Sequence, residues 1–495
     1  MNIRTAANLM GATVEAVGVE LLDKEIKGFS IDSRATSAGE LFFALSQEDY
    51  ERAGFNGTFA DAHRFIPQAF ESGAIASVAR PEHVEGDAEL ESLRPRLLLV
   101  DDCIAALQTL ARKVYEAWAR PVVAITGSAG KTTTKDLVAH LLGSAGQSVL
   151  KSERNYNNGL GLPLSVLQMV TEGKRPDQFD VAVLEMGMSS PTNEIARLCR
   201  ITPPDIGVEL LVAPVHLEYL GTIEAIAEAK AELIEGLKPG GTAILNADDD
   251  YVMKMRALHD GLTLTFGIDN QADVMASEIE TATLGRCRFN LRTPLGVAEA
   301  MLPMPGRHNL MNALAASAVA TCFEISAEEI ALSLRTVVAP HMRGEVLDFA
   351  AGFTVVDDSY NSNPRSLLSM VRTIAEGGAL SARRRIVIAG EMLELGPEGI
   401  EMHREAGREM ARARIDVVWG VRGLAREIIE GAREAGMKDD ATRFFETADE
   451  AADALPVEVR EGDLLLIKGS RGVRTDKVVA ALCDRFPQVG GDERI

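Results

Sequence analysis

The sequence predicts an α/β protein made of three domains. Its 495 residues correspond to about three domains of roughly 150 residues each. Beyond residue 120, short apolar runs typical of buried strands alternate with segments of helical periodicity, which predicts mostly parallel sheets. A composition of 46% hydrophobic and 25% charged residues supplies enough apolar side chains for sizeable cores.

Prolines and glycines mark the two domain boundaries. The helical pattern over 104–119 runs into Arg120-Pro121, and proline disfavours helix at the residue before it. The segment 338–345 contains proline and glycine and is the predicted hinge before the third domain. We therefore expect an N-terminal α/β domain over 1–118, a central domain with a mostly parallel sheet over 119–342, and a C-terminal Rossmann-like domain over 343–495. The strand-like runs of the last two domains are 122–126, 181–187, 242–249, 354–360, 385–391, 416–421 and 463–469.

Composition also excludes several classes of partner. A net charge of −22 would be repelled by a phosphate backbone, so no nucleic acid is expected. No apolar run approaches the roughly 18 residues of a membrane span, and the first residues lack the apolar segment of a secretory signal. The cysteines are scattered and never in C-x-x-C spacing, so we expect reduced core residues in a cytoplasmic protein. They are Cys103, Cys199, Cys287, Cys322 and Cys483.

A glycine-rich loop, here called the phosphate loop (127–134), follows the first strand of the central domain. Strand, glycine loop, lysine, hydroxyl and helix start form a setting in which backbone N–H groups and the helix dipole bind phosphate. Lys131 would neutralise the β- and γ-phosphates, and the Thr132 hydroxyl can ligate Mg²⁺. The strict pattern requires glycine where Ile125 stands, so the glycine spacing is shorter, and an ordinary glycine turn is the alternative. The expected phosphate-binding residues are Gly127, Ser128, Ala129, Gly130, Lys131, Thr132 and Thr133.

Two more residues of the central domain, Glu185 and Lys230, occupy positions that are unusual for a charged side chain. Glu185 ends an apolar strand, and carboxylates at the carboxyl ends of parallel strands point into the ligand crevice. It is a candidate Mg²⁺ ligand, although such a residue often only caps a loop. Lys230 lies in the apolar stripe of a helix that Thr222 can cap. It either extends its ammonium to solvent at the edge of the stripe, or is a neutral amine able to add CO₂.

With its loop T-G-S-A-G-K-T-T, the chain resembles the Mur ligases, which join amino acids or dipeptides to a nucleotide-linked peptide. The segment 214–222, followed by A-K-A-E-L, resembles the family's metal-binding segment, although Leu211-Val212-Ala213 replaces the usual Asn-Ile-Gly. The resemblance implies ATP and two Mg²⁺ ions. Thr132 and Glu185 would hold the first ion, and His216 and a carbamylated Lys230 the second. Lys131, His216 and Lys230 are thereby the expected catalytic residues.

Other motifs extend the resemblance over nearly the whole chain. Residues 305–316 resemble the family's segment that contacts the nucleotide base, 30–45 resemble part of its UDP-binding domain, and 155–163 resemble a segment that faces the nucleotide-linked substrate. In 61–65, alanine replaces the glycine of D-G-H. Besides the phosphate loop, the implied ATP-binding residues are His308, Asn309, Asn312, Arg343 and Asp358. The implied substrate-binding residues are Ser33, Arg34, Asn157, Asn158, Tyr360, Asn361 and Asn363.

One signature indicates a branch of the family. The segment 357–364, D-D-S-Y-N-S-N-P, resembles the branch that uses D-Ala-D-Ala as its amine, and 390–396 with His403 and 468–472 agree with it, Glu391 replacing an aspartate. The resemblance implies transfer of D-Ala-D-Ala to UDP-MurNAc-tripeptide through an acyl phosphate, by a monomer. The alternatives are a sibling ligase of the Mur or folate type with another amine, and a P-loop regulator that binds nucleotide without ligating anything.

Overall fold

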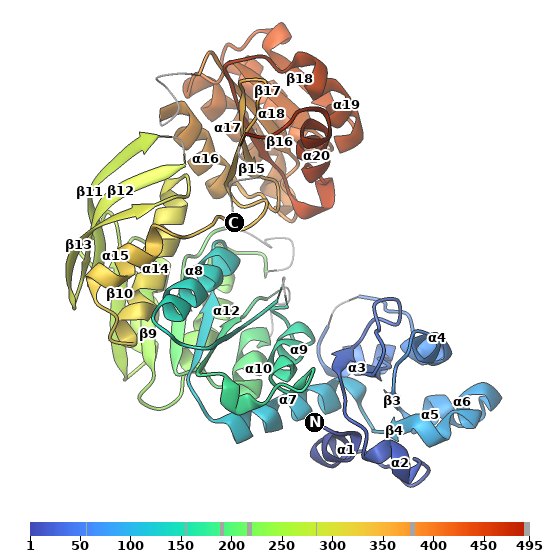
Figure 1. The fold of residues 1–495 in the computed structure, drawn as a ribbon. Coiled ribbons are helices and arrows are strands. Elements are labelled where there is room, and N and C mark those ends of the chain that lie inside the picture. The colour runs from blue at the N-terminus through green and yellow to red at the C-terminus, as the bar shows by residue number, and fades with distance from the viewer. Residues whose placement is uncertain are drawn as a thin grey trace.

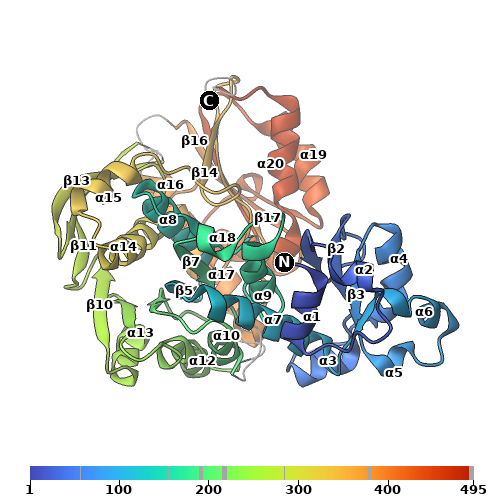
Figure 2. The ribbon, with the colours of Figure 1, turned by 60° about the horizontal axis from the view of Figure 1, so that its bottom comes forward.

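The computed structural model describes residues 1–55, 57–153, 156–188, 193–214, 220–283, 285–376 and 382–489. It contains three separate sheets with helices packed on them, which confirms the predicted α/β architecture (Figures 1 and 2). The N-terminal part lies beside the central part along α7 (Cys103–Trp118), and the C-terminal part covers another end of it. The described residues form no helix that is both long and apolar enough to cross a membrane.

The N-terminal sheet has four parallel strands in sequential order. They are β1 (Gly28–Ser30), β2 (Glu40–Phe43), β3 (Ala76–Ala79) and β4 (Leu97–Leu99). The helices are α1 (Ile3–Met10), α2 (Val19–Leu22), α3 (Gln47–Arg52), α4 (Ile66–Glu71), α5 (Pro81–Val84) and α6 (Ala88–Ser92). Helix α7, predicted over 104–119, is capped by the Asp102 side chain, which accepts a hydrogen bond from the Ala105 N–H. Its buried face belongs to a core that continues into the central domain.

The central sheet has nine strands, and β5 lies between β7 and β8. Its strands are β5 (Val122–Thr126), β6 (Val149–Lys151), β7 (Val181–Glu185), β8 (Ile206–Glu209), β9 (Thr242–Asn246), β10 (Leu262–Gly267), β11 (Val274–Thr283), β12 (Arg286–Thr293) and β13 (Gly296–Leu302). The predicted β5, β7 and β9 are confirmed. The sequence did not predict β8, β6 or β10–β13. The pairs β11–β12 and β12–β13 are antiparallel, an extension at the edge of a parallel sheet.

Helices cover both faces of the central sheet. They are α8 (Lys131–Ser144), α9 (Gly161–Leu167), α10 (Glu194–Ile201), α12 (Ile223–Glu235), α13 (Asp250–Lys254), α14 (Arg307–Cys322) and α15 (Ala327–Leu334). Because strand side chains alternate, Ala124 packs into the core on the α12 side, whereas Val123 and Ile125 pack into the core on the α8 and α14 side. Thr222 caps α12 as predicted, accepting a hydrogen bond from the Ala225 N–H.

The C-terminal sheet has six strands in the order β14-β15-β19-β16-β17-β18, with β14 antiparallel at its edge. The strands are β14 (Glu345–Asp348), β15 (Thr354–Asp358), β16 (Arg384–Gly390), β17 (Val417–Val421), β18 (Thr442–Phe445) and β19 (Asp463–Lys468). The helices are α16 (Pro364–Glu376), α17 (Gly399–Arg412), α18 (Ala425–Glu434), α19 (Ala448–Glu458) and α20 (Asp476–Arg485). Four of the strands, β15, β16, β17 and β19, confirm the predicted runs.

The expectation that all five cysteines are core residues is wrong. Cys103 and Cys199 are buried, whereas Cys287 and Cys483 are half-buried and Cys322 is exposed. Cys322 is the last residue of α14, where the helix leaves its apolar packing and meets solvent. All five are free thiols.

Helices α17 and α18 cross at two glycines, and this crossing yields a stability prediction. A Cβ atom on Gly407 would overlap the Ile428 carbonyl oxygen, and one on Gly431 would overlap the Arg404 carbonyl oxygen. Gly407→Ala should therefore cost about 1–3 kcal/mol of stability, because the backbones must separate. A lower unfolding midpoint and faster amide exchange in α17 and α18 would show this.

Gly143→Ala is the matched control. Gly143 is exposed within α8, and no atom lies within 4 Å of where its Cβ would be. Alanine there should stabilise the helix by up to about 1 kcal/mol. Equal effects of the two substitutions would contradict the close helix crossing.

Candidate active site

The phosphate loop connects β5 to α8 through two glycines with left-handed backbone angles. Gly127 has φ 145° and Gly130 has φ 87°. A Cβ on Gly130 would also overlap Oδ1 of Asn312, so both the backbone angle and the packing require glycine. Helix α8 begins at Lys131, within the segment 127–134 and directly after Gly130, and its N-terminal N–H groups face the site.

Lys131 folds back over the loop. Its Nζ donates a hydrogen bond to the Gly127 carbonyl oxygen at 2.8 Å. Removal from bulk water lowers the pKa of Lys131, and the acidic side chains of Glu185 and Glu209 oppose that shift. These two acids end β7 and β8, the strands on either side of β5. Strand-end acids from two directions therefore lie close to the lysine ammonium.

Glu185 accepts hydrogen bonds from two neighbouring side chains at the predicted metal-binding position. The Thr132 hydroxyl donates to Oε2 of Glu185 at 2.8 Å, and Nδ2 of Asn157 donates to Oε1 at 2.8 Å. The Glu185 side chain is buried. A hydroxyl and a carboxylate at hydrogen-bond distance are hard oxygen donors of the kind that Mg²⁺ prefers. The geometry at Thr132 and Glu185 thus fits one Mg²⁺ ion beside the phosphate loop.

Lys230 is buried on the sheet side of α12 and is only 2% exposed. Burial lowers the pKa of Lys230 to about 7, the charge of Lys131 adds to the effect, and Glu209 opposes it. The structure therefore does not support a lysine that extends its ammonium to solvent. His216, the other residue predicted for the second ion, lies outside the described residues.

Most of the remaining predicted residues meet around one cavity of about 470 Å³ between the central and C-terminal domains. The predicted residues that line it are Ser128, Ala129, Gly130, Lys131, Thr132, Thr133, Asn157, Asn158, Glu185, His308, Asn309, Asn312, Arg343, Asp358, Tyr360, Asn361 and Asn363. Gly127 belongs to the phosphate loop but does not line the cavity. Lys230, Ser33 and Arg34 are not part of it.

A buried ion pair organises the C-terminal wall of the cavity. Nζ of Lys468 lies 2.6 Å from Oδ2 of Asp358 and also donates to the Asn361 carbonyl oxygen at 2.9 Å. The Arg343 guanidinium lies 3.9 Å from the centroid of the Tyr360 ring. Lys468, Ser470 and Arg471 line the cavity but were not predicted as site residues. The motif K-G-S-R-G at the end of an apolar strand was the signal that could have found them.

Helix α14 supplies the wall that the sequence assigned to the nucleotide base. Nδ1 of His308 lies 3.1 Å from Oγ of Ser369, and burial lowers the pKa of His308 to about 4, so the imidazole is neutral. Nδ2 of Asn309 donates to the Pro305 carbonyl oxygen at 2.7 Å. His308 also lines a neighbouring cavity of about 720 Å³. The two cavities together are large enough for a nucleotide.

The two predicted substrate residues of the N-terminal domain lie in the loop after β1. Arg34 is exposed and donates from Nε and Nη2 to both carboxylate oxygens of Asp32, at 2.9 and 2.8 Å. Oγ of Ser33 donates to Oε1 of Gln68 at 3.1 Å. The loop follows the carboxyl end of a parallel strand, where such sheets bind ligands.

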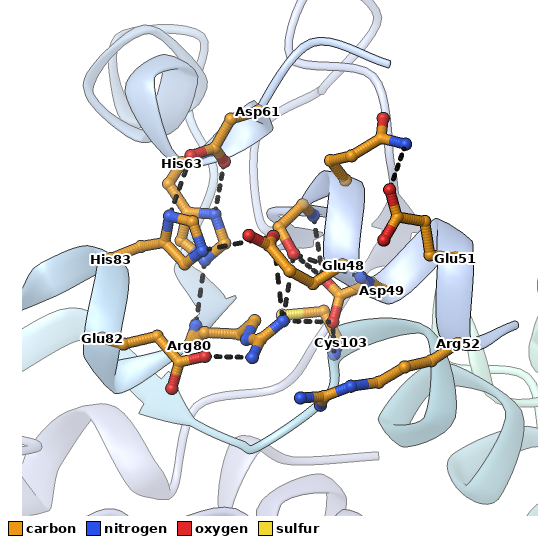
Figure 3. A network of polar contacts seen from close by, with 12 residues as sticks. Glu48, Asp49, Glu51, Arg52, Asp61, His63, Arg80, Glu82, His83 and Cys103 are labelled. Carbon is orange, nitrogen blue, oxygen red and sulfur yellow. Dashed lines mark hydrogen bonds and ion pairs between the residues drawn. The ribbon is translucent and has the colours of Figure 1, made fainter. Parts of the chain in front are cut away.

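A polar network ties together the loops at the same edge of this sheet (Figure 3). Asp61 bridges the Nδ1 atoms of two stacked imidazoles, with Oδ1 2.7 Å from Nδ1 of His63 and Oδ2 2.9 Å from Nδ1 of His83. Nε2 of His63 accepts the Arg80 backbone N–H at 2.9 Å. The guanidinium of Arg80 contacts Glu82. Both nitrogens of His63 are therefore engaged, and the network acts as a fixed support for the edge.

Glu209 is a buried acid that the sequence analysis missed. It is 0% exposed, and neither of its oxygens has a hydrogen-bond partner among the described residues. Burial raises the pKa of Glu209 to about 8, against the opposing charge of Lys230. Its signal in the sequence is the same as that of Glu185, an acid at the last position of an apolar strand.

Known proteins share both the domains and the fold. Residues 125–320 match the Mur ligase middle domain, and 342–471 match the Mur ligase, glutamate ligase domain. The chain is 33% identical to the UDP-N-acetylmuramoyl-tripeptide--D-alanyl-D-alanine ligase of Bacillus subtilis (strain 168), over 93% of each chain. A crystal structure of MurF from Acinetobacter baumannii is 27% identical, with a TM-score of 0.81 over 98% of this chain and 99% of that one. MurF from Thermotoga maritima in complex with ADP is also 27% identical, with a TM-score of 0.75 over 92% and 96%. The chain therefore belongs to the Mur ligase family.

Proposed function

We propose that this chain is an ATP-dependent ligase that adds D-alanyl-D-alanine to UDP-MurNAc-tripeptide, giving the pentapeptide precursor of peptidoglycan. The observation that carries the proposal is the single cavity in which the phosphate loop, the Thr132–Glu185 pair and the 357–364 signature face one another. The names of the relatives support the same amine. We further propose that the chain works in the cytoplasm as a monomer, with domains over 1–118, 119–342 and 343–495.

In this proposal the central domain holds the nucleotide. The phosphate loop and the start of α8 bind the phosphates, and Lys131 turns from the Gly127 carbonyl toward the β- and γ-phosphates. His308, Asn309 and Asn312 bind on the base side, and Arg343 and Asp358 approach from the C-terminal domain. The neutral imidazole of His308 can donate or accept a hydrogen bond without placing a charge beside the base.

Magnesium, when bound, neutralises charge on the phosphoryl group as it is transferred. Thr132 and Glu185 fit the first ion, and Asn157 orients Glu185 through its hydrogen bond. We assign the second ion to His216 and to a carbamate on Lys230. A buried amine with a lowered pKa is a free nucleophile for CO₂ near neutral pH, which fits this assignment.

The acceptor and the amine would approach from different domains. Ser33 and Arg34 would bind the UDP part at the N-terminal sheet, and Asn157 and Asn158 would lie along the peptide. Tyr360, Asn361 and Asn363 would contact the dipeptide from the C-terminal domain. The acceptor carboxylate attacks the γ-phosphate and releases ADP. The dipeptide amine then attacks the acyl phosphate, loses a proton and displaces phosphate. Closure about the hinge 338–345 would exclude water from that intermediate.

The first prediction concerns the amine. With UDP-MurNAc-tripeptide and ATP, D-Ala-D-Ala should give the fastest phosphate release in a panel of amines and matching acceptors. Faster turnover with meso-diaminopimelate or L-glutamate on the shorter acceptor would indicate a sibling ligase. ATP hydrolysis that ignores both co-substrates would indicate a nucleotide-binding regulator.

The second prediction concerns Lys131. Lys131→Ala should lower turnover by about 10²-fold or more, because the variant lacks a charge that stabilises the phosphoryl transition state. Binding of the UDP-linked acceptor, measured by calorimetry, should persist because it belongs to the N-terminal domain. Lys151→Ala is the control, since Lys151 is exposed and pairs with Asp136. Near wild-type turnover of Lys131→Ala would refute the role of the phosphate loop.

The third prediction concerns Lys230. Lys230→Ala should fold, because the substitution removes a buried amine, but should lose most ligase activity. Formate or acetate should restore part of it by supplying a carboxylate at the vacated position. Carbon-13 NMR with labelled bicarbonate should detect the carbamate in the wild-type chain. Full activity after thorough CO₂ removal would contradict the assignment.

A further inference from the structure

Three buried oxygen atoms without partners lie at the carboxyl ends of β5 and β8. They are Oγ1 of Thr126 and both carboxyl oxygens of Glu209, and none has a hydrogen-bond partner in the described part of the chain. Both residues are 0% exposed. Buried polar atoms are nearly always hydrogen-bonded, so three orphaned oxygens at one place call for a group that would satisfy them.

The two side chains lie next to each other on one face of the sheet. Thr126 and Glu209 are register partners in the β5–β8 pair, and residues paired in this way project to the same face. A Cβ on Gly207, two residues before Glu209, would lie 3.1 Å from Leu237 and 3.4 Å from Leu233. Because alternate strand residues share a face, Glu209 and Thr126 point toward α12.

Lys230 is the residue of α12 that meets them. Helix α12 connects the parallel strands β8 and β9, so it runs opposite to β8. The step from Gly207 to Glu209 along the strand therefore corresponds to one turn back along the helix, from Leu233 to Lys230. Lys230 is buried, and its charge is the largest one opposing the shift in the pKa of Glu209.

We propose that Glu209 and Thr126 are positioning residues that receive the carboxyl group formed by CO₂ on Lys230. This inference rests on the proposed function of Lys230. The neutral amine attacks the carbon of CO₂, an N–C bond forms, one C=O bond becomes a C–O⁻ group, and one amine proton leaves to solvent. The new carbamate has two acceptor oxygens for the Thr126 hydroxyl and the Glu209 carboxyl, and each oxygen keeps a lone pair for a metal.

Burial supports this arrangement. Glu209 is fully buried and neither of its oxygens has a partner among the described residues, a setting that disfavours the charged form of a carboxyl group and leaves it a proton to donate to an anion. The opposing possibility is that Glu209 is ionised and acts as the counter-ion of a charged Lys230. In that case the carboxylate would compete with the carbamate, and removing it would favour the carbamate.

The test measures carbamate occupancy by carbon-13 NMR on the full chain with Mg²⁺, across a titration of labelled bicarbonate. Glu209→Val and Thr126→Val each remove a hydrogen-bond donor, whereas Glu209→Gln and Thr126→Ser keep one. Each Val variant should need about tenfold more bicarbonate for half-occupancy, since a hydrogen bond to a charged group is lost. The Gln and Ser variants should stay within about twofold of wild type because they retain a donor.

Thr202→Val is the matched control. Thr202 is buried, and its hydroxyl also lacks a partner among the described residues, but it follows α10 and precedes β8, whereas Glu209 lies at the other end of β8. Its carbamate titration should equal that of the wild type. Thermal unfolding of every sample separates loss of fold from loss of carbamate. Glu209→Val should not lower the midpoint, because it replaces an unpartnered buried acid by an apolar side chain.

Three results would overturn the inference. They are higher occupancy in both Glu209 variants, an equal loss in Thr202→Val, and no carbamate signal in the wild-type chain. Phosphate release with D-Ala-D-Ala, measured on the same samples, tests the ligase function separately. If the wild-type chain forms the peptide bond without a carbamate signal, this inference is wrong and the proposed ligase function is unaffected.

Discussion

The ammonium of Lys131 lies near the acidic side chains that end the two strands flanking β5, and the other features of the site depend on this arrangement. Glu185 ends β7 and Glu209 ends β8, and both oppose the loss of the lysine proton. Parallel strands bring their carboxyl ends to one edge, so acids and the phosphate loop converge there without contacts elsewhere in the chain. Phosphate oxygens would enter a site whose cation is already in place.

Lys230, near the same edge of the central sheet as Lys131, is suited to a different chemistry. Lys131 is half-buried beside a cavity, whereas Lys230 is enclosed between α12 and the sheet. Its amine is therefore hard to charge, and the nearby charge of Lys131 increases that difficulty. The position of Lys131 favours a fixed cation for phosphate, and that of Lys230 favours a neutral nucleophile. The difference arises from burial and not from the residue type.

The cavity is closed by a wall that comes from another domain. The Asp358–Lys468 ion pair joins residues 110 positions apart, and the Arg343–Tyr360 contact joins the linker to the loop after β15. A buried pair of this kind fixes geometry more than it adds stability, because desolvation offsets much of the attraction. In the proposed closure about the hinge 338–345, the C-terminal domain would move toward the phosphate loop as a unit, with this wall unchanged in shape. Such a unit suits a reaction whose intermediate must be kept from water.

The sequence by itself determined the α/β class, the phosphate loop and most of the cavity lining, because those features depend on local patterns. An apolar strand, two glycines, a lysine and a hydroxyl are contiguous, and the 357–364 signature is a single segment. The antiparallel strands β11–β13 were missed because they alternate polar and apolar residues, unlike the apolar runs of buried parallel strands. The exposure of Cys322 also escaped prediction, since it depends on where α14 ends against its neighbours.

Only the tertiary structure decided which residues face one another. It brought Asn157 to Glu185, Lys468 to Asp358, and Glu209 with Thr126 to the face that meets Lys230. Strand order and helix direction set these meetings, and neither is written in any one segment. The environment of Lys230 is the clearest case. Its place in an apolar stripe left two interpretations open. The packing of α12 on β8 buries it, because Gly207 lets Leu233 of the helix and Leu237, just after the helix, approach the sheet closely.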